Sequence, residues 1–347
     1  MKKKTLLGII TILTVISAAC RLGSIQRPAA ASTQPSDASP ETSETAQTVH
    51  ASETYQVAAT RGVAYGQGQR HSEWGSEASE TMPLLLDVYE PVDAPGNRPA
   101  LVLIHGGGLR TGSRMHGPIV QLANYFASRG WVCVSIDYRL EGDHGSLPET
   151  WIEEITANTA NEEAAKQFMA LYPAARDAKA AVRWLYANAD TYQINTRHIT
   201  AGGGSAGAAL SIMLGVTDET HFRDELTLEQ DPSLASTHLD QPARVHTILD
   251  FWGTAGHSPT LHAVLGGDPF DAADAPILIA HGDKDNVVDF ENAETLRSTY
   301  DETGVPYVFY RLTGEPHSAW DARVDGKELD ELSFDFIVEQ QGLNVVE

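Results

Sequence analysis

Short apolar runs alternate with longer amphipathic stretches along most of this chain. Apolar runs of this kind are typical of buried parallel strands, whereas the stretches between them have the periodicity of helices. The pattern predicts strands near 84–89, 100–105, 131–137, 198–204, 245–251, 276–281 and 306–312, and helices near 117–129, 174–190, 206–215, 289–303 and 328–340. This alternation indicates an α/β fold, in which a mostly parallel, twisted sheet of about eight strands carries helices on both faces.

Two segments, 141–173 and 217–242, interrupt the alternation and are interpreted as insertions that form a cap. Insertions at the carboxyl ends of strands build substrate walls in this kind of fold, so we expect both segments to contribute to a pocket. Trp151, Trp252 and His257 are candidates for lining it, although burial in the core is the favoured interpretation for each.

The pentapeptide Gly203-Gly204-Ser205-Ala206-Gly207 lies between a predicted strand and a predicted helix. A serine at such a tight turn is held in a strained conformation that exposes its hydroxyl. The outer glycines are needed because a side chain there would strike the neighbouring strand or helix, and the helix N-terminus directs free N–H groups at any charge formed beside the serine. Taken alone, the pentapeptide fits a close helix–strand packing contact equally well.

The strand predicted near 100–105 runs into His105-Gly106-Gly107-Gly108. A hydrolase that acts on esters must stabilise the oxyanion of a tetrahedral intermediate, and backbone N–H groups do this best where no side chain blocks their approach. Three successive glycines supply such a surface. A phosphate-binding loop is the alternative, but no Lys-Ser/Thr pair follows at the required spacing.

Two later strand ends carry the acid and the base that a serine nucleophile needs. Residues 281–288 read His-Gly-Asp-Lys-Asp-Asn-Val-Val, and His317 follows the strand predicted near 306–312. Serine reacts readily only when a base takes its proton and a carboxylate holds that base in the right tautomer. Ser205, an acid and His317 occur in this order, and Asp283 competes with Asp285 for the acid role.

Together these motifs resemble the α/β-hydrolase superfamily and, within it, the carboxylesterases. The chain is most similar to the feruloyl-esterase-like and acyl-esterase-like branch, close to the hormone-sensitive-lipase-like group. The matching stretches are 86–91, 105–108, 137–140, 177–185, 203–207, 281–285 and 315–317. The resemblance implies a catalytic triad formed by Ser205, Asp285 and His317. It also implies an oxyanion hole formed by the amides of Gly107, Gly108 and Ala206.

The chain departs from the family pattern at two positions. Leu109 stands where many relatives carry an aromatic residue after the glycines, and Gly204 replaces the acidic residue that often precedes the nucleophile in the lipase-like branch. The second departure favours the feruloyl-esterase-like branch. Asp285 is preferred as the acid because the usual family pattern is His-Gly-x-x-Asp-x-x-Val.

The N-terminus predicts export. Residues 1–20 combine Lys2, Lys3 and Lys4 with an uncharged apolar stretch that ends at Cys20, as in a signal peptide of the lipoprotein type, with lipidation at Cys20. Cleavage after 29–31 is the alternative. Residues 21–52 lack aromatic residues and are predicted to be a disordered tether, followed by a catalytic domain over 53–347. The protein is expected to be a membrane-anchored lipoprotein or a secreted or periplasmic protein.

The composition of the chain excludes some classes of binding partner. The formal net charge of −23 argues against binding to nucleic acid or to anionic membrane surfaces, so we expect membrane attachment only through a lipid at Cys20. Cys133, the other cysteine, lies in an apolar strand and is interpreted as structural. The sequence carries no His-Glu-x-x-His or paired-Cys motif, so neither a metal nor another cofactor is expected. It does not indicate an oligomeric state.

The favoured function is therefore a serine carboxylic-ester hydrolase that acts through an acyl-enzyme on short-chain or carbohydrate/aryl esters. A serine peptidase of the same fold is one alternative, although such enzymes usually carry a large extra domain. A non-catalytic surface binding protein on a hydrolase scaffold is the other, although such proteins typically lose the serine, the base or the oxyanion glycines. Short acyl chains are expected because charges interrupt the 141–173 insertion, which leaves no long apolar lid.

Overall fold

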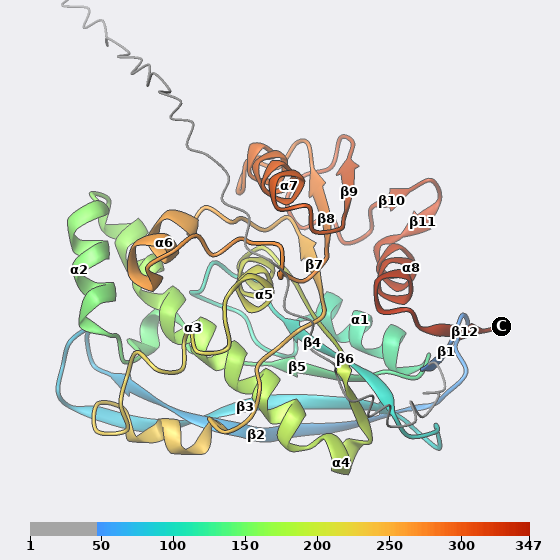
Figure 1. The fold of residues 1–347 in the computed structure, drawn as a ribbon, viewed down its shortest axis with the longest axis horizontal. Coiled ribbons are helices and arrows are strands. Elements are labelled where there is room, and N and C mark those ends of the chain that lie inside the picture. The colour runs from blue at the N-terminus through green and yellow to red at the C-terminus, as the bar shows by residue number, and fades with distance from the viewer. Residues whose placement is uncertain (1–46) are drawn as a thin grey trace, which may run out of the picture. The chain divides into compact units, whose positions relative to one another are not determined.

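The computed structural model describes residues 47–347, and its central feature is an eight-stranded sheet (Figure 1). From one edge to the other the strands are β2 (Val57–His71), β3 (Ser79–Pro91), β5 (Val132–Ile136), β4 (Arg98–Ile104), β6 (Ile194–Gly204), β7 (Thr247–Phe251), β8 (Ile277–Gly282) and β9 (Tyr307–Leu312). The β2–β3 and β3–β5 pairs are antiparallel, and the other pairs are parallel. The predicted, mostly parallel α/β architecture is confirmed.

Helices cover both faces of the sheet (Figure 1). One face packs against α3 (Glu162–Ala187), α5 (Ala206–Val216) and α7 (Glu291–Thr303), and the other packs against α1 (Gly117–Ala127) and α8 (Leu329–Gln341). The strands are apolar on both sides because both faces are covered, which explains the continuous apolar runs in the sequence.

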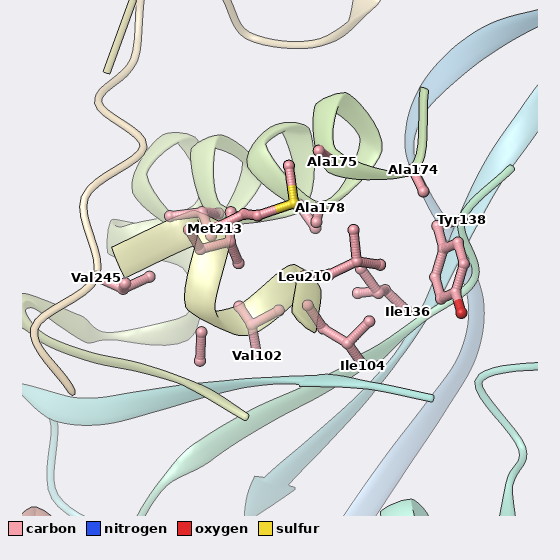
Figure 2. Packing of buried hydrophobic residues seen from close by; sticks show 14 of the residues in the cluster. Val102, Ile104, Ile136, Tyr138, Ala174, Ala175, Ala178, Leu210, Met213 and Val245 are labelled. Carbon is pink, nitrogen blue, oxygen red and sulfur yellow. The ribbon is translucent and has the colours of Figure 1, made fainter. Parts of the chain in front are cut away.

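Alternation along β4 shows how one strand serves both faces. Val102 and Ile104 belong to the cluster with α3 and α5, where Figure 2 shows them beside Leu210 of α5, whereas Leu101 and Leu103 belong to the cluster with α1 and α8. Because all four side chains are completely buried, β4 is held firmly in the middle of the domain. The loop that follows it therefore starts from a fixed position.

The buried side of α3 contains charged residues that find specific partners. Asp177 accepts hydrogen bonds from Nη2 of Arg139 at 2.7 Å and from the Arg139 amide at 2.8 Å. Lys179 Nζ donates to the carbonyl oxygens of Thr217 at 3.0 Å and Asp218 at 2.7 Å. Buried charges persist only when they are paired in this way, so the motifs 137–140 and 177–185 include residues that join elements of the scaffold.

Several helices and strands differ from the sequence-based expectations. β2 was not predicted because the side chains of its first half are mostly exposed and leave no apolar pattern. Helix α3 begins at Glu162, well before the predicted 174, and α6 (Ser258–Leu265) was missed entirely. α2 (Glu149–Asn158) lies within the predicted insertion 141–173 and packs through Trp151 and Ile155.

The domain also begins earlier than predicted. Thr48–His50 form β1, which pairs in parallel with β12 (Asn344–Val346), and Val49 is completely buried. The tether therefore does not reach residue 52, because pairing with the distant C-terminal segment orders a stretch that local composition alone marks as unstructured. The predicted signal peptide 1–20, Cys20 and the tether up to residue 46 lie outside the described residues. Within the described part of the chain, no helix is long and apolar enough to cross a membrane.

The insertion 217–242 does not build a substrate wall, contrary to expectation. It follows the end of α5 and precedes β7, so it starts at the edge of the sheet opposite the carboxyl ends of the parallel strands. It then packs along α3, and η2 (Pro232–Ser236) packs against the second half of β2, where Ser236 Oγ accepts a hydrogen bond from the amide of Gln67 at 2.8 Å. None of its residues lines the cavity at Ser205. Contacts with α3 and β2 hold this segment away from the cavity.

Candidate active site

Ser205 lies at the sharp turn between β6 and α5. Its backbone has φ 57° and ψ −121°, a conformation that a residue with a side chain rarely adopts. Two hydrogen bonds hold the turn: the Ser205 amide donates to the Phe251 carbonyl at 2.9 Å, and the Ala209 amide donates to the Ser205 carbonyl at 3.0 Å. The strain is typical of a nucleophile elbow, which places a serine hydroxyl above the sheet.

The glycines around Ser205 are required by close backbone contacts. A Cβ atom at Gly203 would lie 2.3 Å from the Ile104 carbonyl oxygen, and one at Gly207 would lie 2.1 Å from the same atom. Gly204 is restricted by two indole rings, because a Cβ there would lie 2.8 Å from Cζ2 of Trp320 and 3.0 Å from Nε1 of Trp252. The two tryptophans thus explain why the acidic residue of many relatives is absent here.

The structure brings Asp285 and His317 together. His317 Nδ1 donates a hydrogen bond to Oδ2 of Asp285 at 2.6 Å. An ionised carboxylate only accepts hydrogen bonds, so this contact fixes the proton on Nδ1 and leaves Nε2 as the acceptor. His317 and Ser205 line the same cavity. The side chain that could take the serine proton is therefore in the tautomer that this task requires.

The loop around Asp285 favours the ionised carboxylate. Burial acts to raise the pKa of Asp285, but hydrogen bonds from His317 and from the amides of Val287 and Val288, at 2.8 and 3.0 Å, outweigh burial and lower the pKa. His281 supports the same loop: its Nε2 donates to the Val288 carbonyl at 2.9 Å and lies 3.2 Å from Asp285 Oδ2. Its position in the 281–285 motif was noted from the sequence, but its role was not.

Asp283 lies apart from this pair. Its Oδ1 accepts a hydrogen bond from the Gly314 amide at 2.7 Å, and its Oδ2 accepts one from Arg311 Nε at 3.0 Å. These contacts join the end of β8 to the turn after β9. Of the two carboxylates that compete in the sequence, Asp285 is the one that contacts His317.

Gly107, Gly108 and Ala206 border the cavity beside Ser205. Gly107 and Gly108 have φ values of 113° and 63°, and a Cβ at Gly107 would lie 2.1 Å from the Thr111 carbonyl oxygen. Within residues 47–347, the N–H groups of these three residues have no hydrogen-bond acceptor. Free N–H groups at one cavity wall are the donors that an oxyanion requires.

Side chains from the first turns of α3 and from η1 (Glu141–Asp143) hold the glycine loop. Gln167 Nε2 donates to the Gly108 carbonyl at 3.2 Å. Arg110 donates from Nε to Glu141 at 2.7 Å and from Nη2 to Glu163 at 3.0 Å. The predicted insertion 141–173 thus reaches the site as expected: it supports the loop and lines the cavity through Phe168 and Leu171. Sequence reasoning missed Gln167 because nothing in its local pattern distinguishes it from any exposed helical residue.

Tyr138 supports the same loop from below. Its hydroxyl donates to the His105 carbonyl at 3.0 Å, and its ring stacks on the His105 imidazole with centroids 4.3 Å apart. The matching stretch 137–140 carried no assigned role in the sequence. Its tyrosine orients the end of β4 from which the glycines project.

The cavity at Ser205 has a volume of about 830 Å³. Its apolar wall includes Leu109, Phe168, Leu171, Trp252 and Trp320, and its more polar wall includes Thr254, His257 and Asn292.

Of the three residues proposed from the sequence to line a pocket, Trp151 packs against Tyr172 and Phe222, as the core interpretation predicts. Trp252 and His257 are buried, at 1% and 5% exposed, and both also line the cavity, so burial and pocket lining hold together for these two residues. Across the described residues, no cluster of three or more His, Cys, Asp or Glu side chains could hold a metal ion.

Comparisons with known proteins agree with this geometry. A sequence profile of the BD-FAE family matches residues 86–155 and 161–262. Esterase LipC of Mycobacterium tuberculosis is 31% identical over 152 residues, covering 43% of this chain and 31% of the relative. The probable carboxylic ester hydrolase LipM of the same organism is 26% identical over 239 residues, covering 60% of this chain and 46% of the relative. The chain thus spans less than half the length of these two relatives.

Solved structures show the same fold. Esterase 2 of Thermogutta terrifontis, phosphonylated by cyclosarin, superimposes with a TM-score of 0.55 at 23% identity, covering 82% of this chain and 94% of that chain. A truncated carbohydrate esterase from gut microbiota gives a TM-score of 0.53 at 20% identity, covering 85% and 99%. Sequence motifs, sheet order and family match all agree: the chain belongs to the BD-FAE family of the α/β-hydrolase superfamily.

Proposed function

We propose that this protein is a serine carboxylic-ester hydrolase that works through an acyl-enzyme. The observation that carries the proposal is the convergence of three features at one cavity: Ser205 on its strained turn, the His317–Asp285 pair, and free N–H groups. Each feature occurs alone in non-catalytic proteins. Their combination provides a nucleophile, a correctly protonated base and an electrophilic surface for one carbonyl group.

In the first half-reaction, Ser205 Oγ attacks the ester carbonyl carbon while His317 Nε2 takes the hydroxyl proton. Negative charge develops on the carbonyl oxygen, where the amides of Gly107, Gly108 and Ala206 donate hydrogen bonds. Collapse of the tetrahedral intermediate breaks the bond to the alcohol, which leaves with the proton from His317. Asp285 stabilises the imidazolium throughout.

In the second half-reaction, water replaces the alcohol. His317 takes a proton from the water as its oxygen attacks the acyl carbon, and the same amides receive the oxyanion. The intermediate then releases the carboxylic acid, and His317 returns the proton to Ser205 Oγ. No redox step or cofactor is needed.

The test of the nucleophile is Ser205→Ala, measured with p-nitrophenyl butyrate. Loss of one triad member is expected to lower kcat by about 10⁴- to 10⁶-fold, with the remainder due to the oxyanion donors. Ser211→Ala is the matched control, since this serine lies on the same helix and donates to the Gly207 carbonyl at 2.8 Å. Retention of more than about a tenth of wild-type activity by the Ser205 variant would remove Ser205 from the role.

We further propose that short acyl chains are preferred. A long alkyl chain gains about 0.8 kcal/mol per buried CH₂ only along a continuous apolar trench, whereas Thr254, His257 and Asn292 interrupt the apolar lining. The measurement is kcat/KM for p-nitrophenyl esters from acetate to palmitate, below the micellar limit. A maximum at decanoate or beyond, or activation at an oil–water interface, would instead indicate a lipase.

A further inference from the structure

The polar wall of the cavity comes from the connection between β7 and α6 and from the first turn of α7. Two of its side chains, Thr254 and Asn292, form a hydrogen bond with each other. Thr254 Oγ1 donates to Asn292 Oδ1 at 2.7 Å and accepts from the Gly256 amide at 2.8 Å. Asn292 Nδ2 donates to the Asp289 carbonyl at 2.9 Å. These contacts give the wall a fixed shape and use much of its hydrogen-bonding capacity.

His257 differs from its neighbours in this wall. It lines the cavity and is only 5% exposed, yet neither ring nitrogen has a hydrogen-bond partner within residues 47–347. Its backbone carbonyl accepts a hydrogen bond from the Leu261 amide at 3.0 Å, at the start of α6. Buried polar side chains are normally paired, because leaving one unpaired destabilises the fold. An unpaired one that faces a cavity is therefore a candidate for contact with a ligand.

The chemistry of the ring restricts what it can bind. Burial lowers the pKa of His257 to about 4, so the ring is neutral at neutral pH and offers one N–H donor and one acceptor nitrogen. It is not a second base of the triad, since His317 contacts Asp285. A hydroxyl group can both donate and accept, so it pairs with whichever nitrogen faces the cavity, whereas a carbonyl oxygen pairs only with the protonated one.

We propose that His257 is a specificity-determining residue that hydrogen-bonds a hydroxyl group on the ester substrate, at a position away from the carbonyl attacked by Ser205. The inference rests on the proposed esterase function and names the substrate class within it: hydroxylated esters. The apolar wall formed by Trp252 and Trp320 would receive the hydrocarbon part of the same substrate. The hydroxyl belongs to either the acyl or the alcohol part, and the two are distinguishable by experiment.

Two pairs of esters, each matched in carbon skeleton, provide the test with the full chain. p-Nitrophenyl 3-hydroxybutyrate against p-nitrophenyl butyrate probes the acyl part, and glyceryl 1-butyrate against propyl butyrate probes the alcohol part. In one pair the wild type is expected to favour the hydroxylated ester by about tenfold or more in kcat/KM. Binding of the ester that lacks the hydroxyl leaves the buried His257 ring without a hydrogen-bond partner, and this weakens binding of that ester. The pair that responds identifies the part of the substrate that His257 contacts.

The variants then assign the preference to the imidazole. His257→Leu is expected to bring the responding ratio to about one, whereas His257→Gln, which keeps a donor and an acceptor, restores part of it. His262→Leu is the matched control, because His262 lies on α6, is exposed and does not line the cavity. It should retain the wild-type ratio.

Two results would overturn the inference while leaving the esterase proposal intact: wild-type ratios near one in both pairs, or a His257→Leu variant that keeps the wild-type preference. The wild-type ratios decide the matter even where the leucine variant does not fold. Failure of the wild type to hydrolyse any of the four esters would instead contradict the proposed function, and the inference with it.

Discussion

Asp250 and Asp285 lie at the carboxyl ends of neighbouring strands, and both carboxyl groups are buried, yet their surroundings are opposite in character. Asp285 accepts hydrogen bonds from two backbone amides and from His317. Asp250, on β7, accepts one from the Gly253 amide at 2.8 Å, and its Oδ2 has no partner among the described residues. The difference lies in the number of donors, since both side chains have lost contact with bulk water.

The two pKa values move in opposite directions as a result. Burial raises the pKa of Asp250 to about 7, and the single amide hydrogen bond offsets only part of this effect. For Asp285, the donors outweigh burial and the pKa falls. A buried carboxyl group at a strand end is therefore not sufficient for the acid role in a triad: the role requires a loop that supplies donors.

The largest effect is expected from a substitution that disrupts the Asp285–His317 contact. Asp285→Asn is expected to lower kcat/KM for p-nitrophenyl butyrate by about 10⁴-fold, because an amide in place of the carboxylate favours the wrong imidazole tautomer. Asp283→Asn is the matched control and should stay within about tenfold of the wild type, since its contacts with Arg311 and Gly314 support only the loop. If the Asp283 variant were the more impaired, the acid role would pass to Asp283.

The second largest effect concerns the way in which Asp250 makes the stability of the folded protein depend on pH. Its folded pKa of about 7 lies above the ordinary value of 3.8, so the folded state binds more protons in this window, and stability falls as pH rises from about 4 to about 7. Asp285 acts with the opposite sign: its lowered pKa contributes stability that is lost as pH falls below the ordinary carboxyl range.

Asp250→Asn removes the first contribution while preserving the shape of the side chain. We expect the melting temperature of the variant, relative to the wild type, to rise between pH 5 and pH 8, about the window given by the two pKa values. Thermal unfolding at several pH values measures this difference, with Asp283→Asn as the control, because the pKa of Asp283 is lowered and lies below this window. A difference that does not change with pH would show that Asp250 is already ionised in the folded protein.

The smallest effect is expected from a substitution at Gly253, whose amide donates a hydrogen bond to Asp250. A Cβ at Gly253 would lie 2.5 Å from Asp250 Oδ1 and 2.6 Å from the Ala208 Cβ. Gly253→Ala is therefore expected to destabilise the fold by about 1–3 kcal/mol through overpacking. Gly267→Ala is the control, because a Cβ there meets no atom within 4 Å. Equal melting temperatures for the two variants would mean that the segment after β7 moves to accept the methyl group.

Much of this site was predictable because its signals are local. The apolar runs mark strands that are buried on both faces, and the glycines on either side of Ser205 mark a turn that no larger residue can make. The order of Ser205, an acid and His317 then follows along the chain. The resemblance to a known family added a preference for Asp285 over Asp283.

Other features depend on contacts between distant segments. β2 and β1 have no strong apolar pattern and are ordered by pairing with β3 and β12. The predicted insertion 217–242 reads like a substrate wall, but contacts with α3 and β2 hold it away from the cavity. No local pattern marks Gln167 as a support for the glycine loop.

The sequence by itself determined the strand–helix alternation, the strained turn at Ser205 and the set of side chains able to form a triad, because each depends on residues close together in the chain. The tertiary structure alone decided that Asp285 contacts His317, that Asp250 Oδ2 has no donor among the described residues and that His257 lines the cavity unpaired. Hydrogen-bond partners and burial are set by segments far apart in sequence. These two properties determine which of several similar side chains can do chemistry.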